Sequence, residues 1–159
     1  MASYIQRSLG EGERIVAIAH FHWLYSLVSW LWLGAPAILV AASFAVMDDQ
    51  MRQIVLIGGL ALLVVGTFVF LARMIRKWTT EIGVTSHRFV KKVGLVSLHT
   101  NEIALPNIEG VRVRQGIWGR VWGYGNLRIE GTGVDAVELP IIADPVGFRR
   151  AIETAKGMK

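Results

Sequence analysis

Two long uncharged stretches constrain this chain more than any other feature. No formally charged residue lies between Arg14 and Asp48, and none lies within positions 54–72. A run of about 18 or more apolar residues is long enough, as a helix, to cross the ~30 Å hydrocarbon core of a bilayer. Segments 23–47 and 54–72 both meet this condition. The sequence therefore predicts two transmembrane helices joined by a short connection.

The charges that flank these runs predict their orientation. The connection 48–53 holds two acids and one base. The outer ends of the two runs are basic and carry Arg7, Arg14, Arg73, Arg76 and Lys77. Because basic flanking residues stay on the cytoplasmic side, both termini are expected there. A cleaved signal peptide is disfavoured, since the first run is longer than a secretory apolar region.

Small residues recur along both runs. In the first run they lie on roughly one helical face, and in the second they offer a groove: Gly34, Ala37, Ala41 and Ala45, then Gly59 and Gly66. In lipid, small faces let helix backbones approach closely. Either the two helices pack on each other through them, or the first presents its small face to another membrane protein. Pro36 is expected to kink the first helix.

From Trp78 onward the sequence changes to short alternating segments separated by turns, which is typical of antiparallel strands. Strands are expected at 79–84, 89–93, 95–104, 108–115, 126–130 and 134–139. Between 111 and 114, valines alternate with arginines, so the valines should face inward and the arginines outward.

A helix should end the chain, with Asp144 as its cap and Pro145 at its first position. Its apolar stripe is Phe148, Ala151, Ile152 and Ala155. The expected division is a lead-in at 1–21, a transmembrane hairpin at 22–77 and a β-rich domain at 78–159. Within the lead-in, residues 14–21 fit either a short strand or an extension of the first helix.

Several segments, in this order, resemble the bacterial pleckstrin-homology-like (PH-like) domain of small bacterial membrane proteins. They are Glu81–Phe89, Ile108–Gln115, Gly119–Gly125, Leu139–Pro140 and Asp144–Pro145. The resemblance covers about residues 75–155, and the preceding hairpin matches the family's usual anchor. It implies an α+β protein of the bacterial inner membrane, in which a transmembrane hairpin precedes a PH-like antiparallel β-barrel capped by a C-terminal helix. A shared fold does not define an activity.

The residues that could carry catalysis or bind a metal form no recognisable motif. The chain has no cysteine, which excludes disulfides and thiolate ligands. His20 and His22 flank Phe21 at the predicted membrane boundary without a neighbouring carboxylate, so we interpret them as interfacial polar residues rather than as metal or haem ligands. No enzyme activity, metal or cofactor is expected.

Basic residues are the more suggestive feature, because 14 Lys and Arg stand against 8 Asp and Glu from Arg73 onward. The group nearest the predicted membrane is Arg76, Lys77, Arg88, Lys91 and Lys92. In eukaryotic PH domains the first hairpin binds phosphoinositides, and the resemblance implies Arg88, Lys91 and Lys92 as the corresponding candidates. General attraction to an anionic leaflet is the simpler interpretation.

A second basic group, Arg112, Arg114, Arg120 and Arg128, fits either a solvated face paired with acids such as Glu109 and Glu130 or a docking surface for an acidic partner. The glycines of segment 116–125 predict a bend, and among its aromatic residues we expect one or two of Trp118, Trp122 and Tyr124 to fill the barrel. The alternative is that they project into the bilayer interface or hold a partner peptide.

These observations favour a non-enzymatic, membrane-anchored interaction module. Its expected role is an adaptor or accessory subunit of a membrane complex, with other membrane proteins, a second copy of the chain and anionic inner-leaflet lipids as partners. The alternative is an anionic-lipid sensor or a protein that protects the envelope under stress. Nucleic-acid binding is not expected.

Overall fold

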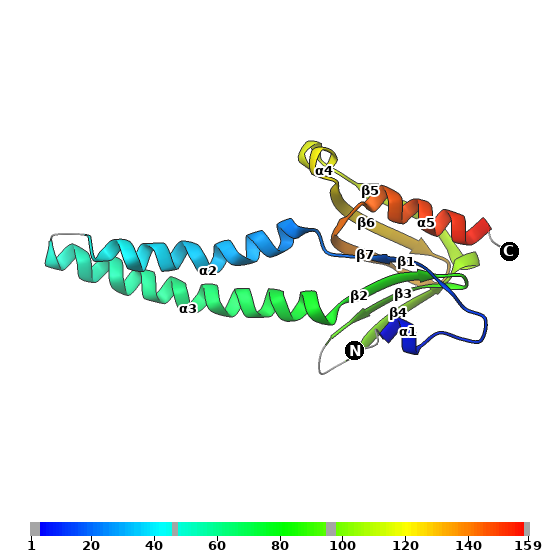
Figure 1. The fold of residues 1–159 in the computed structure, drawn as a ribbon, viewed down its shortest axis with the longest axis horizontal. Coiled ribbons are helices and arrows are strands. Elements are labelled where there is room, and N and C mark those ends of the chain that lie inside the picture. The colour runs from blue at the N-terminus through cyan, green and yellow to red at the C-terminus, as the bar shows by residue number, and fades with distance from the viewer. Residues whose placement is uncertain (1–3, 46–47, 95–97, 158–159) are drawn as a thin grey trace. The chain divides into compact units, whose positions relative to one another are not determined.

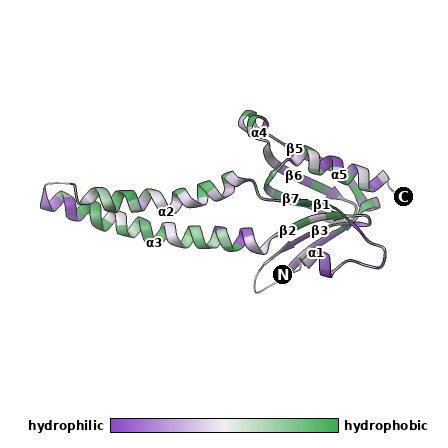
Figure 2. Ribbon diagram, in the orientation of Figure 1, coloured by the Kyte–Doolittle hydropathy of each residue, from purple (hydrophilic) through white to green (hydrophobic). Residues whose placement is uncertain are grey.

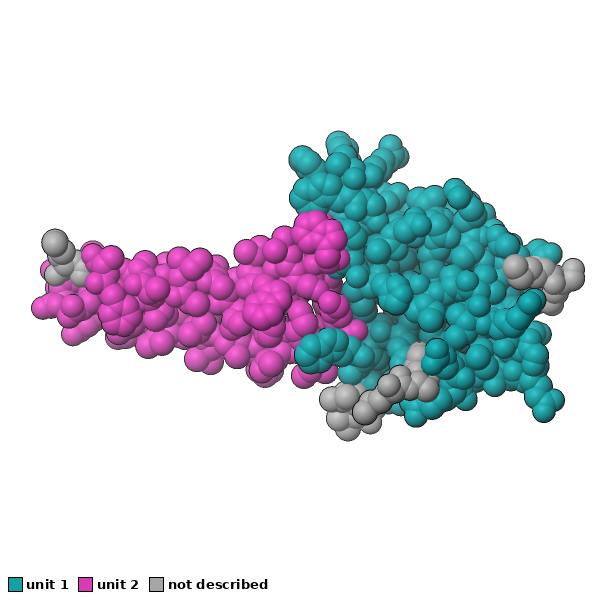
Figure 3. Space-filling model, viewed as in Figure 1, with its two compact units in different colours: residues 1–22, 78–159 teal, residues 23–77 magenta. Residues whose placement is uncertain are grey.

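The computed structural model describes residues 4–45, 48–94 and 98–157, and it divides the chain into two compact units (Figure 1). The first unit, called the β domain below, comprises residues 1–22 and 78–159. The second, called the hairpin, comprises residues 23–77 (Figure 3).

Two antiparallel sheets form the β domain. The first has the strand order β1-β2-β3-β4 and the second the order β5-β6-β7. The strands of the first sheet are β1 (Ile15–Ala19), β2 (Glu81–Thr85), β3 (Arg88–Val93) and β4 (His99–Ala104). Those of the second are β5 (Ile108–Arg114), β6 (Tyr124–Gly131) and β7 (Val134–Ala143). Short helices α1 (Tyr4–Arg7), η1 (Leu105–Asn107) and α4 (Ile117–Trp122) lie between or before the strands.

Strand β1 comes from the N-terminal segment that the sequence analysis separated from the domain. It pairs with β2 in antiparallel register, and Ala19 lies opposite Ile82. The structure thus resolves the choice for residues 14–21 in favour of a strand. The β domain is consequently discontinuous in sequence, and the whole hairpin is inserted between two neighbouring strands of one sheet.

The two sheets do not close into the barrel that the sequence analysis predicted, and that prediction is wrong. Pro106 lies in η1 between β4 and β5, where its missing N–H interrupts a continuous ladder. On the other side, among the described residues, a single bridge between Phe21 and Ile142 links the extension of β1 to β7. The result is a pair of sheets rather than one closed surface.

Helix α5 (Pro145–Gly157) contacts strands of both sheets and completes their core. Its start is as predicted: the Asp144 Oδ1 accepts a hydrogen bond of 2.9 Å from the Gly147 N–H, and Pro145 opens the helix. Phe148, Ile152 and Ala155 are buried. They meet large apolar side chains from the sheets, among them Phe89 and Ile142.

The hairpin consists of α2 (Trp23–Ser43) and α3 (Asp49–Thr79), both long and apolar enough to cross a membrane by length and composition. Hydrophobic residues follow most of their length (Figure 2). The most apolar 18-residue windows of α2 and α3 are only 17% and 11% buried within the protein. A core helix of a water-soluble protein would instead be mostly buried.

Small and polar residues form the buried seam between the two helices, and Trp30 of α2 contacts Phe70 of α3 with ring centroids 4.8 Å apart. Ser29, Pro36 and Ser43 of α2 are buried at seven-residue spacing, as are Gly59 and Gly66 of α3. This spacing keeps one seam of each helix facing its neighbour.

Gly66 lies against the α2 backbone, where an added Cβ would come 2.0 Å from the Trp32 carbonyl oxygen. Trp32 is the residue whose carbonyl would bond to the N–H that Pro36 lacks. Pro36 of α2 thus leaves the Trp32 carbonyl without its usual helical hydrogen bond. Because Gly66 of α3 has no side chain, its Cα–H can approach that carbonyl.

The structure gives different places to the two sets of small residues named in the sequence analysis. Gly59 and Gly66 lie in the helix contact, where a Cβ on Gly59 would meet Val40 at 3.0 Å. On α2, by contrast, no side chain or backbone lies within 4 Å of a Cβ built on Gly34. Ala37 and Ala41 are exposed, whereas Ala45, also exposed, lies after α2 ends at Ser43 and so is not on the predicted helical face. The small face of α2 is therefore not covered by α3.

Candidate interaction surface

Arg88 is held inside a network of the β domain. Its guanidinium donates to both carboxylate oxygens of Glu13, each at 3.0 Å, and to Glu102 at 2.8 Å. A further bond of 2.6 Å reaches the carbonyl of Ser8. Arg88 begins β3 at the turn after Thr85, the end of β2 opposite to that at which the hairpin joins. Its charge is therefore neutralised within the domain, where it ties the N-terminal segment to the sheet.

The Glu13 carboxylate is almost inaccessible, with its side chain 5% exposed. Burial alone would raise its pKa, but hydrogen bonds from the Gly10 N–H, the Thr85 hydroxyl and Arg88 outweigh burial and lower it. The hydrogen bond to Glu13 in turn raises the pKa of Arg88. The two groups remain ionised as a structural pair.

The other two basic residues of the β2–β3 hairpin also have partners inside the β domain. The Lys91 ammonium donates to the Glu138 carbonyl of β7, and burial lowers the pKa of Lys91. Lys92 lies 3.9 Å from Glu81, its cross-strand neighbour. The three residues implied by the family resemblance are thus used in joining strands, and they do not converge on a common pocket.

The arginines of the second sheet form a partly paired outer face. The predicted alternation is observed, because Arg112 and Arg114 are exposed while Val111 and Val113 pack against the core. Arg112 forms the expected ion pair with Glu130 at 3.2 Å, and Arg128 pairs with Glu138 at 3.0 Å. These pairs are solvent-exposed, so each adds little to stability.

Five residues of the two predicted basic groups have no ion-pair partner in the part of the chain that the structure describes. Lys77 and Lys91 form hydrogen bonds to neutral oxygens instead, and the other three are Arg76, Arg114 and Arg120. Arg114 is the last residue of β5 and Arg120 lies in α4, which follows β5, so these two arginines are close in sequence. Arg76 lies in the last turn of α3, where Lys77 donates to the Ser26 hydroxyl at 2.6 Å.

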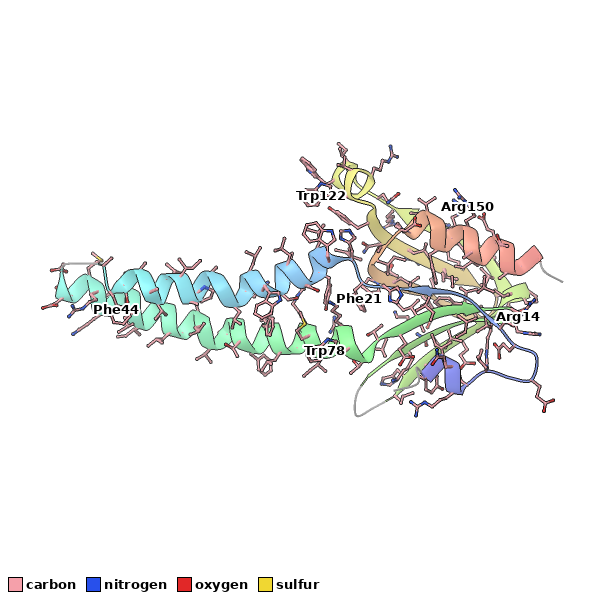
Figure 4. The ribbon with its side chains drawn as sticks, in the orientation of Figure 1. Arg14, Phe21, Phe44, Trp78, Trp122 and Arg150 are labelled. Carbon is pink, nitrogen blue, oxygen red and sulfur yellow. The ribbon has the colours of Figure 1, made fainter. Side chains whose placement is uncertain are left out.

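Helix α4 corrects the expectation that its tryptophans fill a barrel. Trp118 and Trp122 are 65% and 47% exposed, and Ile117 and Val121 are more than half exposed as well. Figure 4 shows the Trp122 side chain at α4, outside the two sheets. The glycine-punctuated segment is therefore a short helix rather than a bend. Its i, i+1, i+4 and i+5 apolar positions were the available signal in the sequence.

The two histidines near the start of the hairpin differ in environment. His22 is buried, and its Nε2–H donates to the Trp122 carbonyl at 3.1 Å while its ring lies 5.3 Å from that of Tyr124. His20 is exposed. Within the described residues no three His, Cys, Asp or Glu side chains gather as metal ligands would.

A model of the bacterial PH domain family matches residues 9–153, which is most of the chain. The chain belongs to the bacterial PH domain family. No curated protein and no solved structure gives a significant match. The family resemblance in the sequence is thus confirmed, and the matched range also extends through β1 and both helices of the hairpin.

Membership describes the β domain as a PH domain, a class of interaction modules that are generally not catalytic. The sequence did not indicate that Arg88, Lys91 and Lys92 of this PH domain have partners inside the domain. Arg88 and its partner Glu13 are 75 positions apart, so no local pattern joins them. What the domain exposes instead is the arginine face of its second sheet and the apolar helix α4.

Proposed function

We propose that this PH domain protein is a membrane-anchored adaptor, held at the cytoplasmic face of the bacterial inner membrane by its hairpin. The PH domain docks protein partners, and the chain acts as an accessory subunit of a larger membrane complex. The observation that carries the proposal is the burial pattern of the hairpin: most of its large apolar side chains face outward, while five of the seven buried residues of its two helices are serine, proline or glycine. That pattern suits a helix pair surrounded by hydrocarbon.

The pairing of β1 with β2 adds support for the topology. Because Ala19 and Ile82 are neighbours in one sheet, both ends of the hairpin must lie on the same side of a membrane. A hairpin between them therefore crosses the bilayer an even number of times, which agrees with two spans. The basic residues at both outer ends favour the cytoplasm as that side.

The exposed small face of α2 is the surface we assign to a partner within the membrane. Ala37 and Ala41 lie one turn apart on α2 and are exposed, and a Cβ built on Gly34 would meet no atom within 4 Å. These positions leave room for the backbone of another transmembrane helix, where close approach replaces hydrophobic attraction as the source of affinity. The arginine face of the second sheet offers an acidic partner a complementary surface in the cytoplasm.

Lipid sensing through the basic residues of the β2–β3 hairpin is less well supported. Arg88, Lys91 and Lys92 would have to exchange their internal partners for a headgroup. Freeing Arg88 would leave the nearly inaccessible Glu13 carboxylate without its counterion, an unfavourable change.

Affinity purification of the tagged full chain in mild detergent tests the proposal. We expect the protein in the membrane fraction, with a stoichiometric partner that is lost from the Ala41→Leu variant. The matched control is Ala61→Leu, the same enlargement at an exposed position of α3. A chain recovered in the soluble fraction would contradict anchoring. A monomer that binds anionic vesicles only with Arg88, Lys91 and Lys92 intact would favour the sensor.

A further inference from the structure

Helix α4 carries an apolar face that the domain does not cover. Ile117 is 83% exposed and Val121 is 67% exposed, and the indole rings of Trp118 and Trp122 lie beside them. At 100° per residue, these four side chains occupy an arc of about 140° on the helix. Large apolar side chains rarely gather on the surface of a water-soluble domain without an interaction to explain them.

The opposite side of α4 is fixed to the sheet. Gly119 is buried so closely that an added Cβ would come 2.6 Å from the Tyr124 carbonyl oxygen. The Gln115 amide donates to that same carbonyl at 3.1 Å. Gly123 ends the helix in a left-handed conformation with φ of 71°. These contacts fix α4 to the sheet, so its exposed apolar face belongs to a well-packed helix and not to a loose loop.

The place of α4 within the PH domain indicates what covers this face. Its last residue, Trp122, accepts the hydrogen bond from His22, and His22 is the residue directly before α2. The His22 N–H donates to Ile141 at 3.2 Å, and the Ala143 N–H donates to His20 at 2.9 Å, so the segment is also held along β7. By chain continuity, α4 lies beside the point where the polypeptide passes into its first apolar helix.

The composition around α4 matches the polar–apolar boundary of a bilayer. Tryptophan concentrates at this depth because its ring is apolar and its N–H is polar. Arg114 and Arg120, which have no ion pair in the described parts of the chain, supply positive charge for anionic headgroups. Trp23 and Trp78, at the two ends of the hairpin, are also exposed. A binding site that faces water would not require exposed tryptophans at α4 and at both ends of the hairpin together with basic residues near α4.

We propose that α4 inserts its apolar face into the cytoplasmic headgroup–acyl boundary of the bilayer that the hairpin crosses. The helix acts as an interfacial wedge that holds the PH domain against the leaflet. This inference rests on the proposed membrane anchoring, but it adds a second contact with lipid that is made by the PH domain itself.

Because the chain contains no cysteine, single-cysteine labelling of the full-length protein gives a direct test. Val121→Cys is labelled with the fluorophore NBD and the protein is reconstituted in phosphatidylethanolamine–phosphatidylglycerol vesicles. We expect a blue-shifted emission, and quenching by lipids with shallow nitroxides at least threefold stronger than by aqueous iodide. Ile117→Cys gives an independent probe of the same face. Glu153→Cys, on the outer side of α5, is the water-exposed control.

A label at Val64, exposed on α3, separates this inference from the proposed function. If Val64 is quenched by deep nitroxides while Val121 and Ile117 respond only to iodide, anchoring stands and the wedge is wrong. If Val64 also responds only to iodide, both proposals fail. If the α4 labels are shielded from iodide and from nitroxide lipids alike, a protein surface covers α4 and the wedge is again wrong.

Discussion

In the PH domain the inaccessible side chains are large and apolar, such as Phe89 and Ile142, whereas five of the seven buried residues of the hairpin's two helices are serine, proline or glycine. Most of the hairpin's phenylalanines and leucines face outward, and Phe68 is 77% exposed. Water drives apolar groups together in the first case. In the second, the helices gain by close backbone approach, as they would in a solvent as apolar as leucine. The same residue type therefore has opposite structural roles in the two units.

Replacing one phenylalanine in each unit is the most direct test of this difference between the PH domain and the hairpin. Phe89→Ala removes a fully buried ring from the PH domain core and should lower the free energy of unfolding by about 3–5 kcal/mol. Phe68→Ala removes an outward-facing ring and should change it by less than about 0.5 kcal/mol. Denaturant unfolding of the full chain in detergent, followed by near-ultraviolet circular dichroism, measures both. Equal losses would mean that Phe68 is part of a protein core.

The hairpin should be most sensitive to a change that is small in volume. Gly66→Ala would place its Cβ against the Trp32 carbonyl and force the helices apart, with an expected loss of about 1–3 kcal/mol. Gly58→Ala, on the same helix with no atom within 4 Å of its Cβ, is the matched control and should be neutral or slightly stabilising. Titration with sodium dodecyl sulfate in mixed micelles compares them. Equal tolerance at both positions would rule out the close contact at Gly66.

Acid should weaken the PH domain selectively through Glu13. The pKa of this carboxylate is lower in the folded than in the unfolded chain, so its contribution to stability is present above the unfolded pKa of about 4.3. That contribution is lost as the pH falls through the folded pKa. Glu13→Gln should lower stability by about 1–2 kcal/mol at pH 7 and flatten the loss below pH 5.

The pH dependence is measured by denaturant unfolding between pH 3 and pH 7. Glu153→Gln, an exposed position paired only with Arg149 on the same helix, is the control and should retain the acid-dependent loss. An unchanged slope in Glu13→Gln would show that other carboxylates govern acid sensitivity.

Features that depend on neighbouring residues were predictable from the sequence. The apolar runs gave both long helices, the valine–arginine alternation gave the faces of β5, and Asp144 with Pro145 gave the start of α5. Helix α3 extends beyond its apolar run at both ends, because charged residues such as Asp49 and Arg76 continue the helix without being apolar. Part of the predicted strand 95–104 lies outside the described residues, and its described portion forms β4 from His99.

Features that depend on distant pairing were not predictable. Nothing local assigns Ile15–Ala19 to a sheet, because its partner strand begins only after both helices. The partners of Arg88 are distant for the same reason. The tryptophans of α4 were misplaced because a glycine-rich segment suggests a bend, while the packing of Gly119 on Tyr124 is visible only in three dimensions.

The position of the hairpin also affects the entropy cost of completing the first sheet. The ribosome finishes β1 at Ala19 and does not start β2 until Glu81, so the nascent chain carries an unpaired strand while both apolar helices are made. Docking of α2 on α3 brings those distant positions together and reduces the entropy lost in joining them. Pairing of β1 with β2 therefore closes a loop that contains the whole hairpin, and a hairpin that is already assembled lowers the entropy cost of completing the first sheet.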